Sequence, residues 1–207
     1  MKTINALLLP LVLLGSAHAL AEDDARLVIN GCVIEPDSQC PNADLRGANL
    51  ANQDLRRINL AGADLSGADL RHANLDLANL EKARLKGANL TRASLQQANL
   101  RLADFSEARL VAIRGWGLFG QAAQFRQADL TGAFLEFARL SGAKLHDSRL
   151  IAADLEMAWL SKADLKGADL SDANLADANL RGARRHYATF QGTNMEGCRD
   201  CPIGWER

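Results

Sequence analysis

Leucine recurs at every fifth position through most of this chain. Of the 31 positions spaced by five from Leu45 to Met195, 24 are Leu, three are Phe and one is Met. Three positions break the series: Gly115, Gly120 and Arg185. Two residues before each of these positions Ala predominates, and Asp or Asn commonly lies between the two. The repeating unit is therefore Ala-(Asp/Asn)-Leu-x-x.

A period of five fits neither a straight α-helix nor a straight strand. Successive Leu residues would lie about 140° apart around a helix, so they would not share a face. In an extended strand a step of five would send each Leu to the opposite face, because side chains alternate. The chain must therefore bend within every pentapeptide. If each bend is near a right angle, four units close a square coil of 20 residues with Leu and Ala inside.

Three local predictions follow from this coil. Glycine two places after Leu, as at Gly47 and Gly62, suits a corner with positive φ. Phe105 and Phe125 are one coil apart, so their rings should stack inside the shaft. The Asp and Asn residues that precede Leu should hydrogen-bond the backbone at the corners.

Runs such as 43–47 (ADLRG), 63–67 (ADLSG) and 168–172 (ADLSD) carry a resemblance to a known family. The chain resembles the pentapeptide-repeat family over residues 43–195, which is 153 of 207 residues. This resemblance implies an all-β fold, a right-handed quadrilateral parallel β-helix, whose handedness the spacing alone does not supply. Each coil of such a solenoid contacts only its neighbours, so both ends need caps.

Residues 1–21 are typical of a secretory signal peptide. Lys2 precedes an apolar run from Ala6 to Leu14, and cleavage after Ala19 or Ala21 would satisfy the small-x-small rule. Nine residues are too few for a membrane span, which needs about 20. We therefore expect an exported protein with no membrane span, either in the periplasm of a Gram-negative bacterium or secreted into the medium.

Caps are expected on both sides of the repeat, at 22–42 and 196–207. Two short apolar runs flank Asn30-Gly31, which is a two-residue signal for a β-hairpin. The C-terminal region carries Tyr187, Phe190, Met195 and Trp205, which suit a cap, although a dimer interface is the alternative.

Cysteine occurs only within the two expected caps. An even number of cysteines in an exported chain favours disulfide bonds. We expect two such bonds, which join Cys32 to Cys40 and Cys198 to Cys201. The alternative is a zinc site that uses Cys198, Cys201 and His186, but this set lacks an obvious fourth ligand.

The charge balance disfavours a nucleic-acid partner. The chain has 24 basic and 25 acidic residues, for a net charge of −1. Some members of the resembled family protect type II topoisomerases by imitating DNA, and this function is the alternative, disfavoured by the charge and the export signal. The sequence contains no nucleophile elbow, phosphate-binding loop or dinucleotide fingerprint. We therefore expect no enzymatic activity, no cofactor and no metal site.

Large apolar residues at outward positions are the candidate binding surface. Six of them fall on two successive faces of the coil: Trp116, Phe119, Phe134, Phe137, Met157 and Trp159. The segment 111–124 is expected to be irregular, either a distorted coil or a loop that folds over these side chains. The sequence predicts a non-enzymatic exported scaffold or protein-interaction module, with an unidentified protein or cell-envelope partner or a second copy of itself.

Overall fold

The computed structural model describes residues 26–202. The predicted signal peptide at 1–21 and Trp205 of the predicted C-terminal cap therefore lie outside the described residues. Within residues 26–202, no helix has the length and hydrophobicity that crossing a membrane requires.

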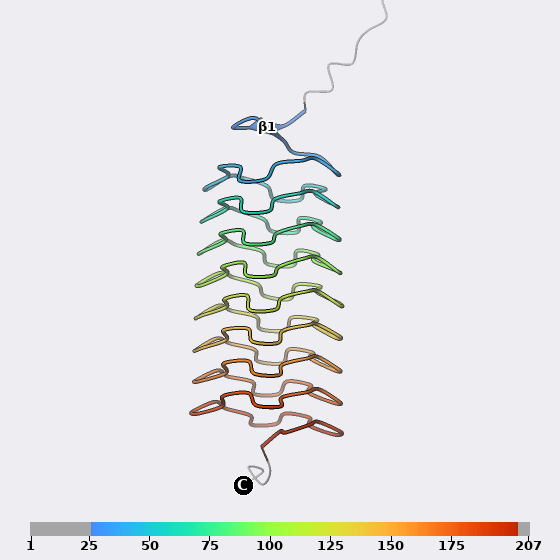
Figure 1. Ribbon diagram of the computed structural model, residues 1–207, viewed down its shortest axis with the longest axis vertical. Coiled ribbons are helices and arrows are strands. Elements are labelled where there is room, and N and C mark those ends of the chain that lie inside the picture. Colours follow the sequence, from blue (N-terminus) through green and yellow to red (C-terminus); the bar gives the residue numbers. More distant parts are fainter. Residues whose placement is uncertain (1–25, 203–207) are drawn as a thin grey trace, which may run out of the picture.

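A small hairpin begins the described chain (Figure 1). Its strands are β1 (Val28–Ile29) and β2 (Cys32–Val33), which pair antiparallel. The turn residues Asn30 and Gly31 both have positive φ, at 50° and 82°. A type I′ turn needs positive φ at both central residues, which Asn and Gly tolerate best.

The rest of the described chain is a right-handed quadrilateral parallel β-helix (Figure 1). Single-residue parallel bridges join positions 20 residues apart, from Gln39↔Asn59 to Asn179↔Arg199. The Leu45 amide donates to the Asp64 carbonyl at 2.7 Å, and the Asp64 amide donates to the Ala43 carbonyl at 2.9 Å. Backbone groups are thus satisfied between coils rather than along one strand.

A tight turn forms every corner. At one of them the Ala48 amide donates to the Leu45 carbonyl at 3.1 Å, and Gly47 between them has φ of 62°. Positive φ recurs at every fifth position from 37 to 197, as a type II turn requires at its third residue. Most of these corner residues are not Gly, so the requirement is broader than the glycines in the sequence suggested.

Asx-type hydrogen bonds support many of the corners. The Asn49 side-chain oxygen accepts from the Ala51 amide at 3.2 Å, and Asp64 accepts from the Ser66 amide at 3.0 Å. These bonds confirm the role expected for the residues before Leu, because they fix the backbone two residues later.

Leucine and alanine fill the shaft. From Leu45 to Leu180, every Leu at the fifth-position spacing is at most 2% exposed. The Phe105 and Phe125 rings stack as expected, with centroids 5.2 Å apart and planes at 10°. Such burial is the main stabilising term of the fold, because removal of apolar surface from water is the dominant favourable contribution to folding.

The segment 111–124 is a regular coil, which corrects the expectation that it is irregular. Its residues keep the bridge pattern, as in Ser94↔Arg114 and Asp104↔Gln124. Leu118 at an Ala position is buried and, with Leu135 and Leu140 of the next coil, takes the space that Leu would fill at Gly115 and Gly120. Exchange of large and small side chains preserves core volume, so no loop forms to cover the neighbouring aromatic residues.

A disulfide bond lies at each end of the shaft. At the N-terminal end Cys32, Ile34 and Cys40 are buried against the core, and a disulfide joins the two cysteines, whose Cα atoms are 5.4 Å apart. At the C-terminal end a disulfide joins Cys198 and Cys201.

An arginine takes part in closing the C-terminal end. Arg185 replaces Leu in the core column, and its guanidinium donates to the Asp200 carbonyl. Phe190 is buried, but Tyr187 is 86% exposed at a corner. Tyr187 therefore does not contribute to the cap, contrary to the expectation from the sequence.

Candidate functional site

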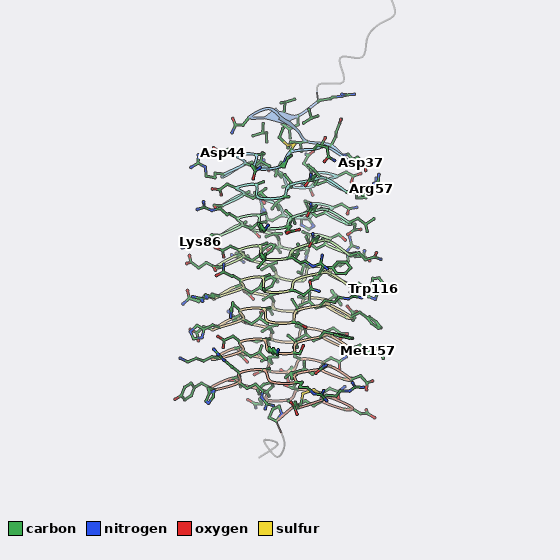
Figure 2. All side chains as sticks on the ribbon, in the orientation of Figure 1. Asp37, Asp44, Arg57, Lys86, Trp116 and Met157 are labelled. Carbon is green, nitrogen blue, oxygen red and sulfur yellow. A yellow bond between two sulfur atoms is a disulfide. The ribbon has the colours of Figure 1, made fainter. Side chains whose placement is uncertain are left out.

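Five of the six predicted binding residues form one exposed surface. We call this surface the aromatic patch, and its members are Trp116, Phe134, Phe137, Met157 and Trp159. Their exposed fractions range from 39% for Met157 to 59% for Trp159. Figure 2 shows Trp116 and Met157 along one edge of the shaft, opposite Asp44 and Lys86. The coil produces this surface because residues 20 apart lie side by side.

The patch contains two shallow hollows. Trp116 and Phe134 line the first, of about 300 Å³, together with Gln96, Arg114 and Glu136. Phe137, Met157 and Trp159 line the second, of about 510 Å³, with Asp177, Asn179, Gly197 and Arg199. The Trp116 and Phe137 rings meet at 5.8 Å between centroids, with planes at 57°, and so connect the two hollows. Exposed aromatic groups beside polar side chains are typical of protein-binding surfaces.

Phe119, the sixth predicted residue, lies differently. It is half-buried, and so less exposed than the patch residues, and guanidinium groups from the two adjacent coils cover its ring. The Arg101 guanidinium carbon is 5.3 Å from the ring centroid and that of Arg139 is 5.1 Å away. These cation–π contacts occupy the ring within the chain itself. Phe119 is therefore a support for the neighbouring face rather than a member of the patch.

Glu136 carries no distinguishing signal in the sequence, yet among the described carboxylates it has an unusual environment. Its Oε2 is covered by neighbouring atoms and has no hydrogen-bond partner. Elsewhere in the coil, a side chain 18 residues later supplies the donor: Asn99 donates to Glu81 Oε2 at 3.5 Å and Asn174 to Glu156 Oε2 at 3.4 Å. The residue 18 places after Glu136 is Asp154, an acceptor.

The N-terminal coils show the opposite situation, because their carboxylates pair with arginine. Arg46 donates two side-chain hydrogen bonds to Asp44, at 2.8 and 2.6 Å. The side chain and the amide of Arg46 lower the pKa of Asp44 from 3.8 to about 2. In the same way, the Arg57 guanidinium lowers the pKa of Asp37, one coil away.

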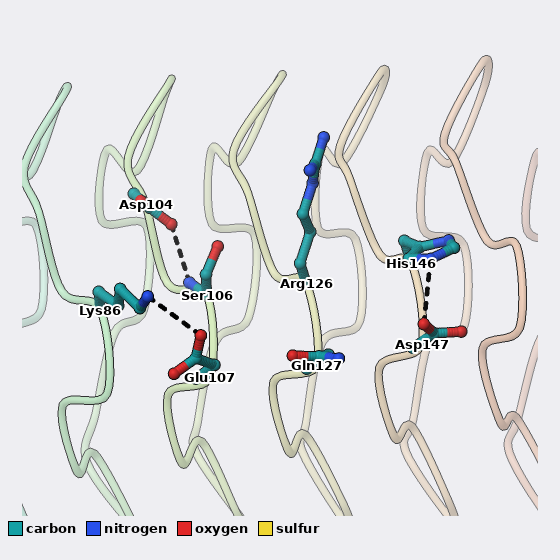
Figure 3. A pocket seen from close by; sticks show the side chains of 8 residues that line it. All are labelled: Lys86, Asp104, Ser106, Glu107, Arg126, Gln127, His146 and Asp147. Carbon is teal, nitrogen blue, oxygen red and sulfur yellow. Dashed lines mark hydrogen bonds and ion pairs between the residues drawn. The ribbon is translucent and has the colours of Figure 1, made fainter.

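A third hollow, of about 350 Å³, lies on the edge opposite the patch (Figure 3). Its charged groups are largely paired with one another. Lys86 Nζ lies 3.1 Å from Glu107 Oε1, and His146 Nε2 lies 3.0 Å from Asp147 Oδ2. This arrangement offers no pair of groups converging on a common point, and the hollow is better described as a solvated charged surface.

Metal binding finds little support in the described part of the chain. No group of three or more His, Cys, Asp or Glu side chains converges there. The cysteines of the alternative zinc set, Cys198 and Cys201, are joined to each other in a disulfide.

The repeat itself has known counterparts. The family model for pentapeptide repeats matches eight copies, over residues 43–81, 83–111, 121–156 and 158–198. The chain belongs to the pentapeptide-repeat family. Among curated proteins, no sequence matches it.

Solved pentapeptide-repeat structures resemble the chain. HetL from the cyanobacterium Nostoc, involved in heterocyst differentiation regulation, is 30% identical and aligns over 79% of this chain and 87% of its own, with a TM-score of 0.29. A pentapeptide-repeat protein of the Arabidopsis thaliana thylakoid lumen is 32% identical over 52% and 70%, with a TM-score of 0.31. The fluoroquinolone resistance protein QnrB1 is 21% identical over 78% and 90%, with a TM-score of 0.44.

Proposed function

We propose that this pentapeptide-repeat protein is an exported, non-enzymatic interaction module that presents the aromatic patch to a protein partner. The exposure of five large apolar side chains on one edge carries the proposal. Such contiguous surfaces on soluble proteins mark binding sites, and aromatic residues dominate their binding energy.

The backbone gives a second reason. Phe137 and Met157 occupy corner positions with φ of 59° and 55°. Left-handed backbone costs a residue with a Cβ about 1–2 kcal/mol, and Gly117, at the same corner one coil before Phe137, avoids this cost. Folding alone therefore does not require a bulky apolar side chain at these corners, and Phe137 and Met157 are free to serve binding.

Site-specific photo-crosslinking in cells tests the protein-binding role. A photoreactive phenylalanine at position 137 is expected to trap one protein of defined mass. The matched control places the same group at Gln127, an exposed corner on the opposite edge. Equal labelling from both positions, or none from position 137, would contradict the proposal.

Light scattering on the oxidised protein then distinguishes the kinds of partner. A dimer that Trp116→Ala or Trp159→Ala dissociates would identify the partner as a second copy of the chain. A monomer in all variants, together with the crosslink, would identify a different protein.

Export is tested separately with a C-terminal alkaline phosphatase fusion, which is active only outside the cytoplasm. We expect activity from the full chain and its loss when residues 1–21 are deleted. Activity that survives this deletion would contradict the role of that segment.

A further inference from the structure

The hollow at Trp116 combines two aromatic walls with an unpaired carboxylate oxygen. Trp116 and Phe134 are 44% and 49% exposed, and Glu136 lines the same hollow. Glu136 Oε2 is covered and accepts no hydrogen bond. A covered acceptor without a donor costs free energy. Rotation of the Glu136 side chain toward the hollow would let a ligand supply that donor and recover the cost.

Negative charge accumulates around this oxygen. Phe134 pairs with Asp154 in the next coil, and Glu156 follows Glu136 one coil later at the equivalent position. Arg114 is the one cation among the residues that line the hollow, and among the described ion pairs none joins it to Glu136. The lining itself holds one carboxylate and one guanidinium, and the carboxylates of Asp154 and Glu156 in the next coil add negative charge beside it, which favours a cationic ligand.

On the neighbouring face, an aromatic ring is covered by cation–π contacts from within the chain. Phe119 lies between the guanidinium groups of Arg101 and Arg139, at 5.3 and 5.1 Å. Among the described residues, no such contact covers Trp116 or Phe134. Tryptophan is the strongest cation–π partner, and a planar guanidinium both stacks on a ring and donates to a carboxylate in its own plane.

We infer that the Trp116–Phe134 hollow is a recognition pocket for an arginine side chain of the partner. The guanidinium would stack on the aromatic walls and donate to the Glu136 carboxylate, because Asp154 stands where other coils have an Asn donor. The inference rests on the proposed function, since it names the chemistry of the partner at the same surface. Two or more hydrogen-bond donors in one plane distinguish arginine from lysine here.

The test uses the oxidised full-length mature chain and two tripeptides. The probes are acetyl-Gly-Arg-Gly-amide and its neutral isostere acetyl-Gly-citrulline-Gly-amide, and the readout is the Trp116 indole N–H resonance, assigned with a Trp116→Phe variant. We expect saturable shifts with the arginine peptide and at least tenfold weaker binding of the citrulline peptide. Equal binding of the two peptides, or no shift of Trp116, would overturn the inference.

Two variants locate the effect. Glu136→Gln keeps the shape of the side chain and is expected to weaken binding of the arginine peptide about tenfold, which corresponds to about 1.4 kcal/mol. Glu81→Gln, at the same pentapeptide position but on another face of the shaft, is expected to leave it unchanged. Unchanged binding to Glu136→Gln, with its thermal unfolding also unchanged, would exclude the carboxylate as the recognition group.

Failure of this inference is distinguishable from failure of the proposed function. A crosslink through position 137 without arginine-peptide binding would leave the aromatic patch as an interface and remove the arginine pocket. Arginine-peptide binding without a crosslink would retain the pocket and remove the cellular protein partner.

Discussion

Leu118 occupies the space beside Gly115 in the shaft. A Cβ built on Gly115 would lie 2.6 Å from Leu118 Cδ2, closer than real contacts allow. The ordinary repeat has Leu at the first of these positions and Ala at the second. Relative to the ordinary repeat, the large and the small side chain have therefore exchanged positions. The packing of each residue depends on the size of the other.

This exchange predicts strong coupling between the two positions. Leu118→Ala leaves a cavity and is expected to lower the free energy of unfolding by about 3 kcal/mol. Gly115→Leu overpacks the shaft and should cost about 1–3 kcal/mol. The double variant restores the ordinary repeat and should recover most of both losses, as measured by urea unfolding. Additive losses in the double variant would show that the sites are independent.

The N-terminal disulfide is expected to hold the cap on the first coil. Replacing Cys32 and Cys40 by Ser should lower the free energy of unfolding by about 2–5 kcal/mol. Because each coil contacts only its neighbours, amide exchange should accelerate at Leu45 and Leu50 and remain unchanged at Leu165. Uniform acceleration along the shaft would contradict this nearest-neighbour picture.

The pairing of Asp44 with Arg46 predicts a low carboxyl titration midpoint. Folding lowers the pKa of Asp44 from 3.8 to about 2. The resulting stabilisation is present above pH 4 and is lost as the pH falls through about 2. NMR titration of the side-chain carboxyl carbon should show the midpoint near 2, and Arg46→Gln should raise it. Arg56→Gln, which acts on Asp54, serves as the control.

Bulky residues at the corners predict a substitution that increases stability. Leu102 is 50% exposed with φ of 59°, so Leu102→Gly removes strain at little cost in burial. We expect a gain of about 1 kcal/mol in the free energy of unfolding. The same substitution at Leu100, which is fully buried, should destabilise the protein. A loss of stability in Leu102→Gly would show that the corner tolerates its Leu without strain.

The five-residue period was sufficient to predict the coil, because a step of five between buried positions fits neither a straight helix nor a straight strand. The Phe105–Phe125 stack followed from the same arithmetic. The segment 111–124 was predicted wrongly as irregular, because the sequence pattern registers Gly115 as a missing Leu and cannot show that Leu118 fills the gap.

The candidate site was predictable only in part. The outward aromatic residues could be placed on faces by counting in steps of 20. Glu136 could not be identified, because its lack of a donor depends on a contact between residues 18 apart that exists only once the coil has its real dimensions. The cover over Phe119 was missed for the same reason.

Because bridges join residues 20 apart, the number of residues between two positions sets the angle between them around the shaft. Inserting or deleting one pentapeptide between the hairpin and Trp116 would keep every Leu inside. It would, however, rotate the aromatic patch a quarter turn about the shaft relative to the N-terminal cap. Four pentapeptides would return the patch to its original direction, one coil farther away. Such an insertion or deletion would therefore change the direction of the aromatic patch relative to the N-terminal cap, while leaving the core, the cap and the patch intact.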